Sequence, residues 1–91
     1  MRLHIHGQGL TFGGAERERV ERRFGFALGR FGDSVGRVTV HLVDVNGPRG
    51  GADKRCRAVV EVAGHRPVVV EDADARLEVA IDRAADRVGR A

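Results

Sequence analysis

What this sequence lacks excludes several classes of protein. It has a single cysteine, Cys56, so neither an internal disulfide nor a metal site built from several thiolates can form. It has no apolar stretch of the roughly 20 residues that a membrane span needs, and its first residues, MRLHIHGQGL, lack the apolar run of a signal peptide. We therefore expect a protein of the reducing cytoplasm without a membrane partner, and we expect Cys56 to be a small buried residue.

The sequence is also poor in aromatic residues, which argues against RNA recognition by base stacking. Its aromatic residues are four phenylalanines, with no tyrosine or tryptophan. RNA-binding modules that stack bases carry aromatic side chains on a sheet. Here all four lie in or beside one predicted helix, so we expect any RNA recognition to use phosphates, 2′-hydroxyls and shape. These residues are Phe12, Phe24, Phe26 and Phe31.

Length and charge set further limits. The 91 residues predict a single domain over residues 1–91, too short for a doubly wound nucleotide-binding fold. A content of 42% hydrophobic and 32% charged residues is typical of a globular chain. The net charge of +3 suits an acidic partner but is modest, so the argument depends on where the arginines lie.

Two periodicities of apolar residues alternate along the chain. Alternation at every second position predicts strands, and recurrence every three or four positions predicts helices. The predicted strands are residues 2–7, 37–45, 54–63 and a short strand around 68–70, and the predicted helices are residues 15–30 and about 72–88, the latter capped by Asp72 or Asp74.

The order of these elements predicts an α+β fold of two layers, β-α-β-β-β-α. A right-handed crossover places the first helix on one face of the sheet, and both apolar helix stripes need cover. One sheet face has the matching aliphatic residues, so we expect both helices on that face of a four-stranded sheet of order 1-2-3-4. Strands two to four form an antiparallel meander in this prediction, and the arginines and histidines of the other face lie in water.

A basic hairpin tip joins the second and third predicted strands. The segment 44–57, DVNGPRGGADKRCR, combines turn-forming residues with four cations. Glycines allow close approach of the backbone to another surface, and guanidinium groups bind phosphate through paired hydrogen bonds. We therefore expect this tip to contact a polyanion.

Five segments carry a family resemblance: DVNGPRGG from Asp44, DKRCR from Asp53, VEDAD from Val70, AIDRA from Ala80, and Asp86-Arg. They resemble the ribosome hibernation-promoting factors, a family also called sigma-54 modulation proteins. The resemblance implies a fold similar to double-stranded-RNA-binding domains and binding to the small ribosomal subunit near the mRNA and tRNA sites. It also implies that translation is blocked in stationary phase without enzymatic activity, and that this chain is a short form, without the second domain by which long forms pair two ribosomes.

Arginines form a stripe on each predicted helix as well. The helices are predicted to be parallel, so at most one stripe can meet the acidic flank of the other helix, and we expect the remaining stripe to be free. That stripe and the hairpin tip form the predicted rRNA footprint, whereas the alternative is that the helix arginines only form solvated ion pairs. The candidates are Arg49, Lys54, Arg55 and Arg57 in the hairpin, Arg22, Arg23 and Arg30 in the first helix, and Arg83, Arg87 and Arg90 in the last helix.

Two other functions remain open from the sequence. His4 and His6 share a strand face that His41 on the next strand can join, which provides three nitrogen ligands for a metal ion, although flanking arginines would repel it. The second name of the family suggests a protein-binding modulator of transcription. No serine or cysteine has an evident base and orienting acid, so we expect no enzyme, no cofactor and no small-molecule substrate, and a monomer when off the ribosome.

Overall fold

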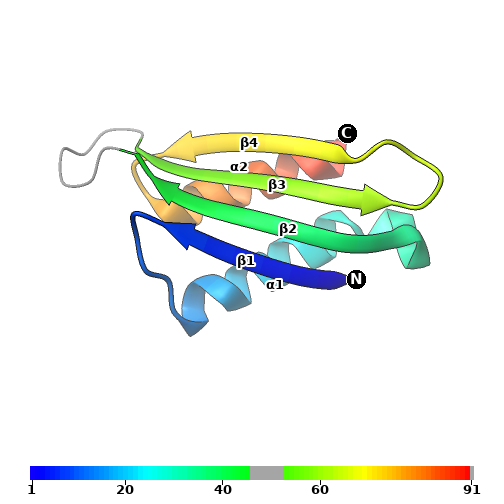
Figure 1. Ribbon diagram of the computed structural model, residues 1–91, viewed down its shortest axis with the longest axis horizontal. Coiled ribbons are helices and arrows are strands. Elements are labelled where there is room, and N and C mark those ends of the chain that lie inside the picture. The colour runs from blue at the N-terminus through cyan, green and yellow to red at the C-terminus, as the bar shows by residue number, and fades with distance from the viewer. Residues whose placement is uncertain (46–52, 91) are drawn as a thin grey trace.

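The chain follows the order strand, helix, three strands, helix in the computed structural model, which describes residues 1–45 and 53–90 (Figure 1). A short 3-10 helix, η1, follows the first α-helix. The elements are β1 (Arg2–Gln8), α1 (Gly14–Ala27), η1 (Gly29–Ser34), β2 (Val35–Asp44), β3 (Lys54–Val62), β4 (Val68–Asp74) and α2 (Leu77–Arg90).

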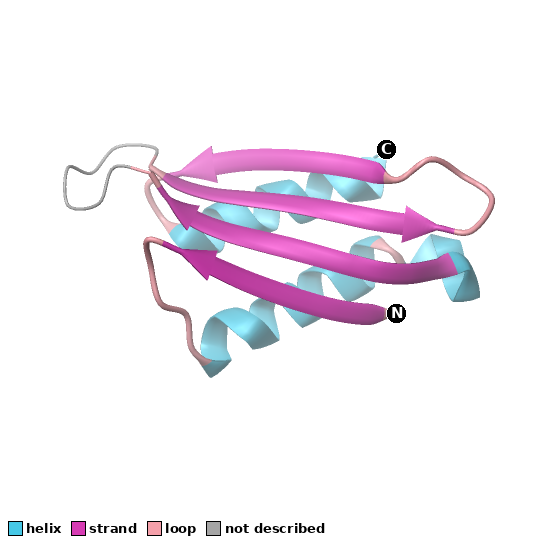
Figure 2. Ribbon diagram, viewed as in Figure 1, coloured by secondary structure: helices cyan, strands magenta, loops and turns pink. Residues whose placement is uncertain are grey.

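The four strands form one mixed sheet of order β1-β2-β3-β4. β1 runs parallel to β2, and the other two pairs are antiparallel. Both helices lie on the same face of this sheet (Figure 2). The predicted two-layer α+β fold is therefore confirmed. None of the helices in the described ranges is long and apolar enough to cross a bilayer.

The core lies between the sheet and the two helices because alternate strand residues point toward the helices. Cys56 and Leu42 face each other across β2 and β3, and both are fully buried. From the helices, Phe24 and Ile81 are the largest side chains with no exposed surface. Burial raises the pKa of the Cys56 thiol to about 12, with a smaller contribution from nearby Asp72. Cys56 is the buried residue that the sequence predicts.

Both helix boundaries differ from the prediction. β4 continues to Asp74, which lies opposite Lys54 of β3, and α2 begins only at Leu77. Strand pairing therefore overrides the capping preference of Asp72. Asp74 still accepts a hydrogen bond from the Arg76 backbone N–H at 2.9 Å, so it orders the turn into the helix.

The first helix ends earlier than predicted. It stops at Ala27 rather than Arg30, and the chain continues as the 3-10 turns of η1. Gly32 interrupts these turns at φ 55° and ψ −131°, a conformation that favours glycine. The α-helix therefore ends before the apolar stripe does, and Phe31 of that stripe lies in η1.

Candidate nucleic-acid interface

The arginines of α1 that face α2 form ion pairs with an aspartate of α2. Arg19 makes a bidentate contact with Asp82, from Nε to Oδ1 at 3.0 Å and from Nη2 to Oδ2 at 2.8 Å. Arg23 Nε lies 3.1 Å from Asp82 Oδ1. The hydrogen bond from Arg19 holds the pKa of Asp82 below its usual range. One arginine stripe therefore meets the acidic flank of the other helix, as the sequence predicts.

The two remaining candidates near α1 differ in how firmly they are held. Arg22 Nη1 lies 3.4 Å from Glu18 Oε1 in an exposed pair one helical turn apart, which restrains it weakly. Arg30 is in η1, where its guanidinium lies 4.7 Å from the centroid of the Phe31 ring. Its Nη2 also donates to the Val88 carbonyl of α2 at 3.4 Å. Arg22 is thus the more adaptable of the two.

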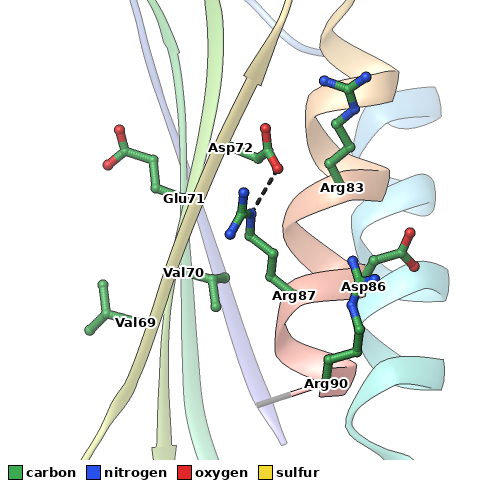
Figure 3. Close-up of a pocket in the computed structure, with 8 residues that line it drawn as sticks. All are labelled: Val69, Val70, Glu71, Asp72, Arg83, Asp86, Arg87 and Arg90. Carbon is green, nitrogen blue, oxygen red and sulfur yellow. Dashed lines mark hydrogen bonds and ion pairs between the residues drawn. The ribbon is translucent and has the colours of Figure 1, made fainter.

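The arginines of α2 line a groove between this helix and the edge strand β4 (Figure 3). The groove has a volume of about 710 Å³. Figure 3 shows Arg83, Arg87 and Arg90 on its helix side, with Asp72 opposite Arg87 on the strand. The structure therefore brings together all three candidates that the sequence assigned to the last helix.

Two of these arginines are paired, so the expectation that the remaining arginine stripe is free is wrong. Arg87 Nε donates to Asp72 Oδ2 at 2.8 Å, and Arg83 Nη1 lies 3.7 Å from Asp74 Oδ1. The pairs form because β4 extends far enough to place both carboxylates beside α2. The hydrogen bond from Arg87 lowers the pKa of Asp72.

The pairs leave most of the arginine donors available. A guanidinium has five N–H donors, and the bond from Arg87 to Asp72 uses the one on Nε. The side chains of Arg83 and Arg87 are 55% and 57% exposed. Arg90 has no carboxylate partner in the part of the chain that the structure describes. The groove therefore holds three guanidinium groups that can still bind phosphate.

The base of the predicted hairpin is an internal ion cluster. Lys54 Nζ lies 3.2 Å from Asp44 Oδ2 and 3.2 Å from Asp53 Oδ2. The hydrogen bond to Asp53 raises the pKa of Lys54. Asp53 is only 1% exposed, so Lys54 has the role of neutralising a buried carboxylate. Lys54 is consequently a weaker candidate for RNA contact, and Arg49 lies outside the described residues.

Arg55 and Arg57 project from the face of the sheet that the helices leave open. Arg55 Nε lies 3.3 Å from Glu71 Oε1 on β4. Arg57 is exposed and has no ion-pair partner within residues 1–45 and 53–90. Of the two, Arg57 is therefore the better placed to bind an external phosphate.

The histidines of the open face do not form the three-ligand arrangement considered from the sequence. His6 and His41 face each other across β1 and β2, and their rings stack with centroids 5.3 Å apart and planes at 22°. His4 lies opposite Thr39 in the next row. No group of three His, Cys, Asp or Glu among the described residues is arranged to hold a metal ion. The metal hypothesis has no support from this geometry.

Sequence reasoning gave no role to Phe26, which is 90% exposed on α1. The apolar stripe of that helix includes Val20 and Phe24, both fully buried, and Phe26 lies off the stripe. The helical periodicity of the sequence therefore already indicates that the Phe26 ring points outward.

Comparison with known proteins places the chain in a family. The sequence matches the model of the family described as Sigma 54 modulation protein / S30EA ribosomal protein over residues 3–91. The chain belongs to this family. The resemblance seen in the sequence is confirmed, and membership supports a ribosome-associated function rather than a known class of enzyme.

Two solved structures share the fold. The N-terminal domain of Thermus thermophilus Protein Y matches with a TM-score of 0.80 and 29% sequence identity, covering 99% of this chain and 93% of that chain. A ribosomal subunit interface protein from Coxiella burnetii matches with a TM-score of 0.79 and 16% identity, covering 99% of this chain and 91% of that chain. The second likeness shows the fold alone. No curated protein sequence matches the chain.

Proposed function

We propose that this protein is a translation inhibitor that binds the small ribosomal subunit through rRNA phosphates and blocks the mRNA and tRNA sites in stationary phase or stress. The family match over residues 3–91 carries the proposal. The arginine groove between α2 and β4 supports it, because exposed guanidinium groups held at fixed positions suit phosphate binding.

Basic side chains on both faces of the protein suit a concave binding site. Arg83, Arg87 and Arg90 lie on the helix side of the sheet, whereas Arg57 lies on the open side. A flat RNA surface can contact only one of these sides. A channel with RNA on both walls can contact both, and the mRNA path of the small subunit is such a channel in this proposal.

The proposal includes a simple set of partners. The protein acts as one domain and a monomer when off the ribosome, with rRNA of the small subunit as its partner and neither a membrane nor a small-molecule substrate. Ribosome association places it in the cytoplasm.

Co-sedimentation with ribosomes tests this function directly. The purified protein is centrifuged with small subunits and with whole ribosomes at low and at physiological salt, with and without bound mRNA and initiator tRNA. Contacts to about six phosphates predict an affinity loss of roughly two to three orders of magnitude between the two salt concentrations. Pelleting that is abolished by occupied mRNA and tRNA sites supports the proposal. Absence of pelleting at low salt contradicts it.

A further inference from the structure

An exposed aromatic ring borders a hollow between the C-terminal ends of the two helices. Phe26 is 90% exposed, and among the described residues it is the one exposed phenylalanine. The hollow has a volume of about 400 Å³. It is lined by Phe26 and Ala27 of α1 and by Ala85, Asp86, Gly89 and Arg90 of α2.

The floor of this hollow is formed by small apolar residues. Ala27, Ala85 and Gly89 have the smallest side chains available, so the two helices approach each other closely here. A methyl group added at Gly89 would lie 3.7 Å from Cβ of Ala27, which is ordinary contact distance. The floor therefore offers a shallow apolar surface beside the Phe26 ring.

The rim of the hollow is polar and charged. Asp86 and Arg90 lie one turn apart on α2, and both line the hollow. Neither has an ion-pair partner in the described part of the chain. Asp86 thus offers a hydrogen-bond acceptor and Arg90 offers donors, directly beside an apolar surface.

We propose that this hollow binds one unpaired RNA base, stacked on Phe26. This differs from the sequence-based expectation of recognition without base stacking, because the exposed ring lies on a helix and not on the sheet. The inference rests on the proposed function and names a part of the RNA that the arginines alone cannot recognise. A base is planar and apolar on its faces and carries N–H groups on its edge. The carboxylate of Asp86 can accept hydrogen bonds from these N–H groups. Arg90 lines both this hollow and the arginine groove, so it joins the base site to the phosphate site.

The surrounding charge favours RNA over an apolar protein segment as the ligand. Arg22 precedes Phe26 by one turn of α1, and its side chain is 58% exposed. With Arg90 on the other side, the ring lies between two cations that attract a phosphate backbone. A hydrophobic peptide would gain little from either.

Tryptophan fluorescence tests the stacking directly. The chain contains no tryptophan or tyrosine, so the variant Phe26→Trp has a single indole, located at the hollow. It is titrated with a single-stranded RNA oligonucleotide and with an abasic oligonucleotide of equal length and charge. Quenching by the first and not by the second is expected. Equal responses to both would show that only phosphates are bound and would overturn the proposal.

Binding to small subunits gives a second readout. Phe26→Ala should weaken binding by about 5- to 150-fold, the range measured for loss of one stacked base, whereas Phe26→Trp should retain it. His65→Ala is the control, because it removes an exposed ring between β3 and β4 that lines neither the hollow nor the arginine groove. Circular dichroism melting checks that all variants fold.

The possible failures can be distinguished. If the wild-type protein does not bind small subunits, the proposed function fails and the base site fails with it. If the wild-type protein binds and Phe26→Ala binds equally well, only the base site fails. A photoreactive benzophenone side chain introduced at position 26 identifies the neighbour, for which we expect an rRNA nucleotide. Crosslinking to a ribosomal protein instead would overturn the proposal.

Discussion

Arg87 of α2 donates a hydrogen bond through Nε to Asp72 Oδ2 of β4 across 2.8 Å. This bond joins the last helix to the edge strand and fixes the position of one guanidinium in the arginine groove. The carboxylate occupies one donor, and the side chain is 57% exposed, so the other donors remain available in the groove. The same pair therefore contributes to the fold and prepares an arginine for an external anion.

Replacing Arg87 should affect binding more than stability. Arg87→Ala should lower the free energy of unfolding by at most about 1 kcal/mol, because the pair is exposed. It should reduce the slope of log affinity against log salt by about one, since one phosphate contact is lost.

Arg66→Ala is the matched control for that measurement. Arg66 is exposed before the start of β4, does not line the arginine groove, and has no ion pair among the described residues. It removes the same charge, so its salt slope should match that of the wild-type protein. Equal slopes for Arg87→Ala and Arg66→Ala would exclude a specific phosphate contact at Arg87.

Stability should fall in acid because two carboxylates are held ionised by arginines. Arg19 lowers the pKa of Asp82, and Arg87 lowers that of Asp72. A carboxyl with a pKa lower in the folded than in the unfolded chain stabilises the fold above the unfolded value of about 3.9. That contribution is lost as pH falls through the folded pKa.

Asp82→Asn tests the acid effect at the helix interface. It should cost on the order of 1–2 kcal/mol at neutral pH, because it removes the ionised partner of both Arg19 and Arg23. Its stability should decline less than that of the wild-type protein between pH 5 and pH 2 in urea unfolding. An unchanged pH dependence of stability would show that the pKa of Asp82 is the same in the folded and the unfolded chain.

The order of strands and helices could be predicted from the sequence because the apolar periodicities that indicate them are local and repeated. The alternation through Val38, Val40 and Leu42 predicts a strand with one buried face, and a register slip of one residue would turn these side chains toward solvent. The end of β4 could not be predicted in the same way. Asp72 has the local preference of a helix cap, and only its pairing with Cys56 on a distant segment makes it a strand residue.

The sequence predicted which arginines belong to the candidate site but not which residues they contact. The sequence identified Arg83 and Arg87 by their position on a helix wheel, which gives a face but no partner. Their pairing with Asp74 and Asp72 depends on how far the neighbouring strand extends. The stacking of His6 on His41 likewise depends on the register of a parallel pair that is remote in sequence.

The thiol of Cys56 should be unreactive in the folded protein. Burial raises its pKa to about 12, so hardly any thiolate exists at neutral pH, and no surface of the residue is exposed. A maleimide reagent at pH 7 should label it only after unfolding in urea. Rapid labelling of the native protein would mean that β3 opens readily, and a reactive role would then deserve a test.

The two basic faces should contribute independently to ribosome binding. A triple variant of Arg49, Arg55 and Arg57 to alanine removes charge from the predicted hairpin tip and the open sheet face. A triple variant of Arg83, Arg87 and Arg90 removes it from the helix side. Arg55 and Arg57 are exposed, so the first variant should fold nearly normally.

If RNA lies on both sides of the protein, each triple variant should weaken co-sedimentation by at least tenfold, and the combined variant should multiply the two losses because the faces share no partners. Their salt slopes should fall by about three each, one for every phosphate contact removed. A loss confined to one variant would instead place all the RNA on that side and would contradict a channel with two walls.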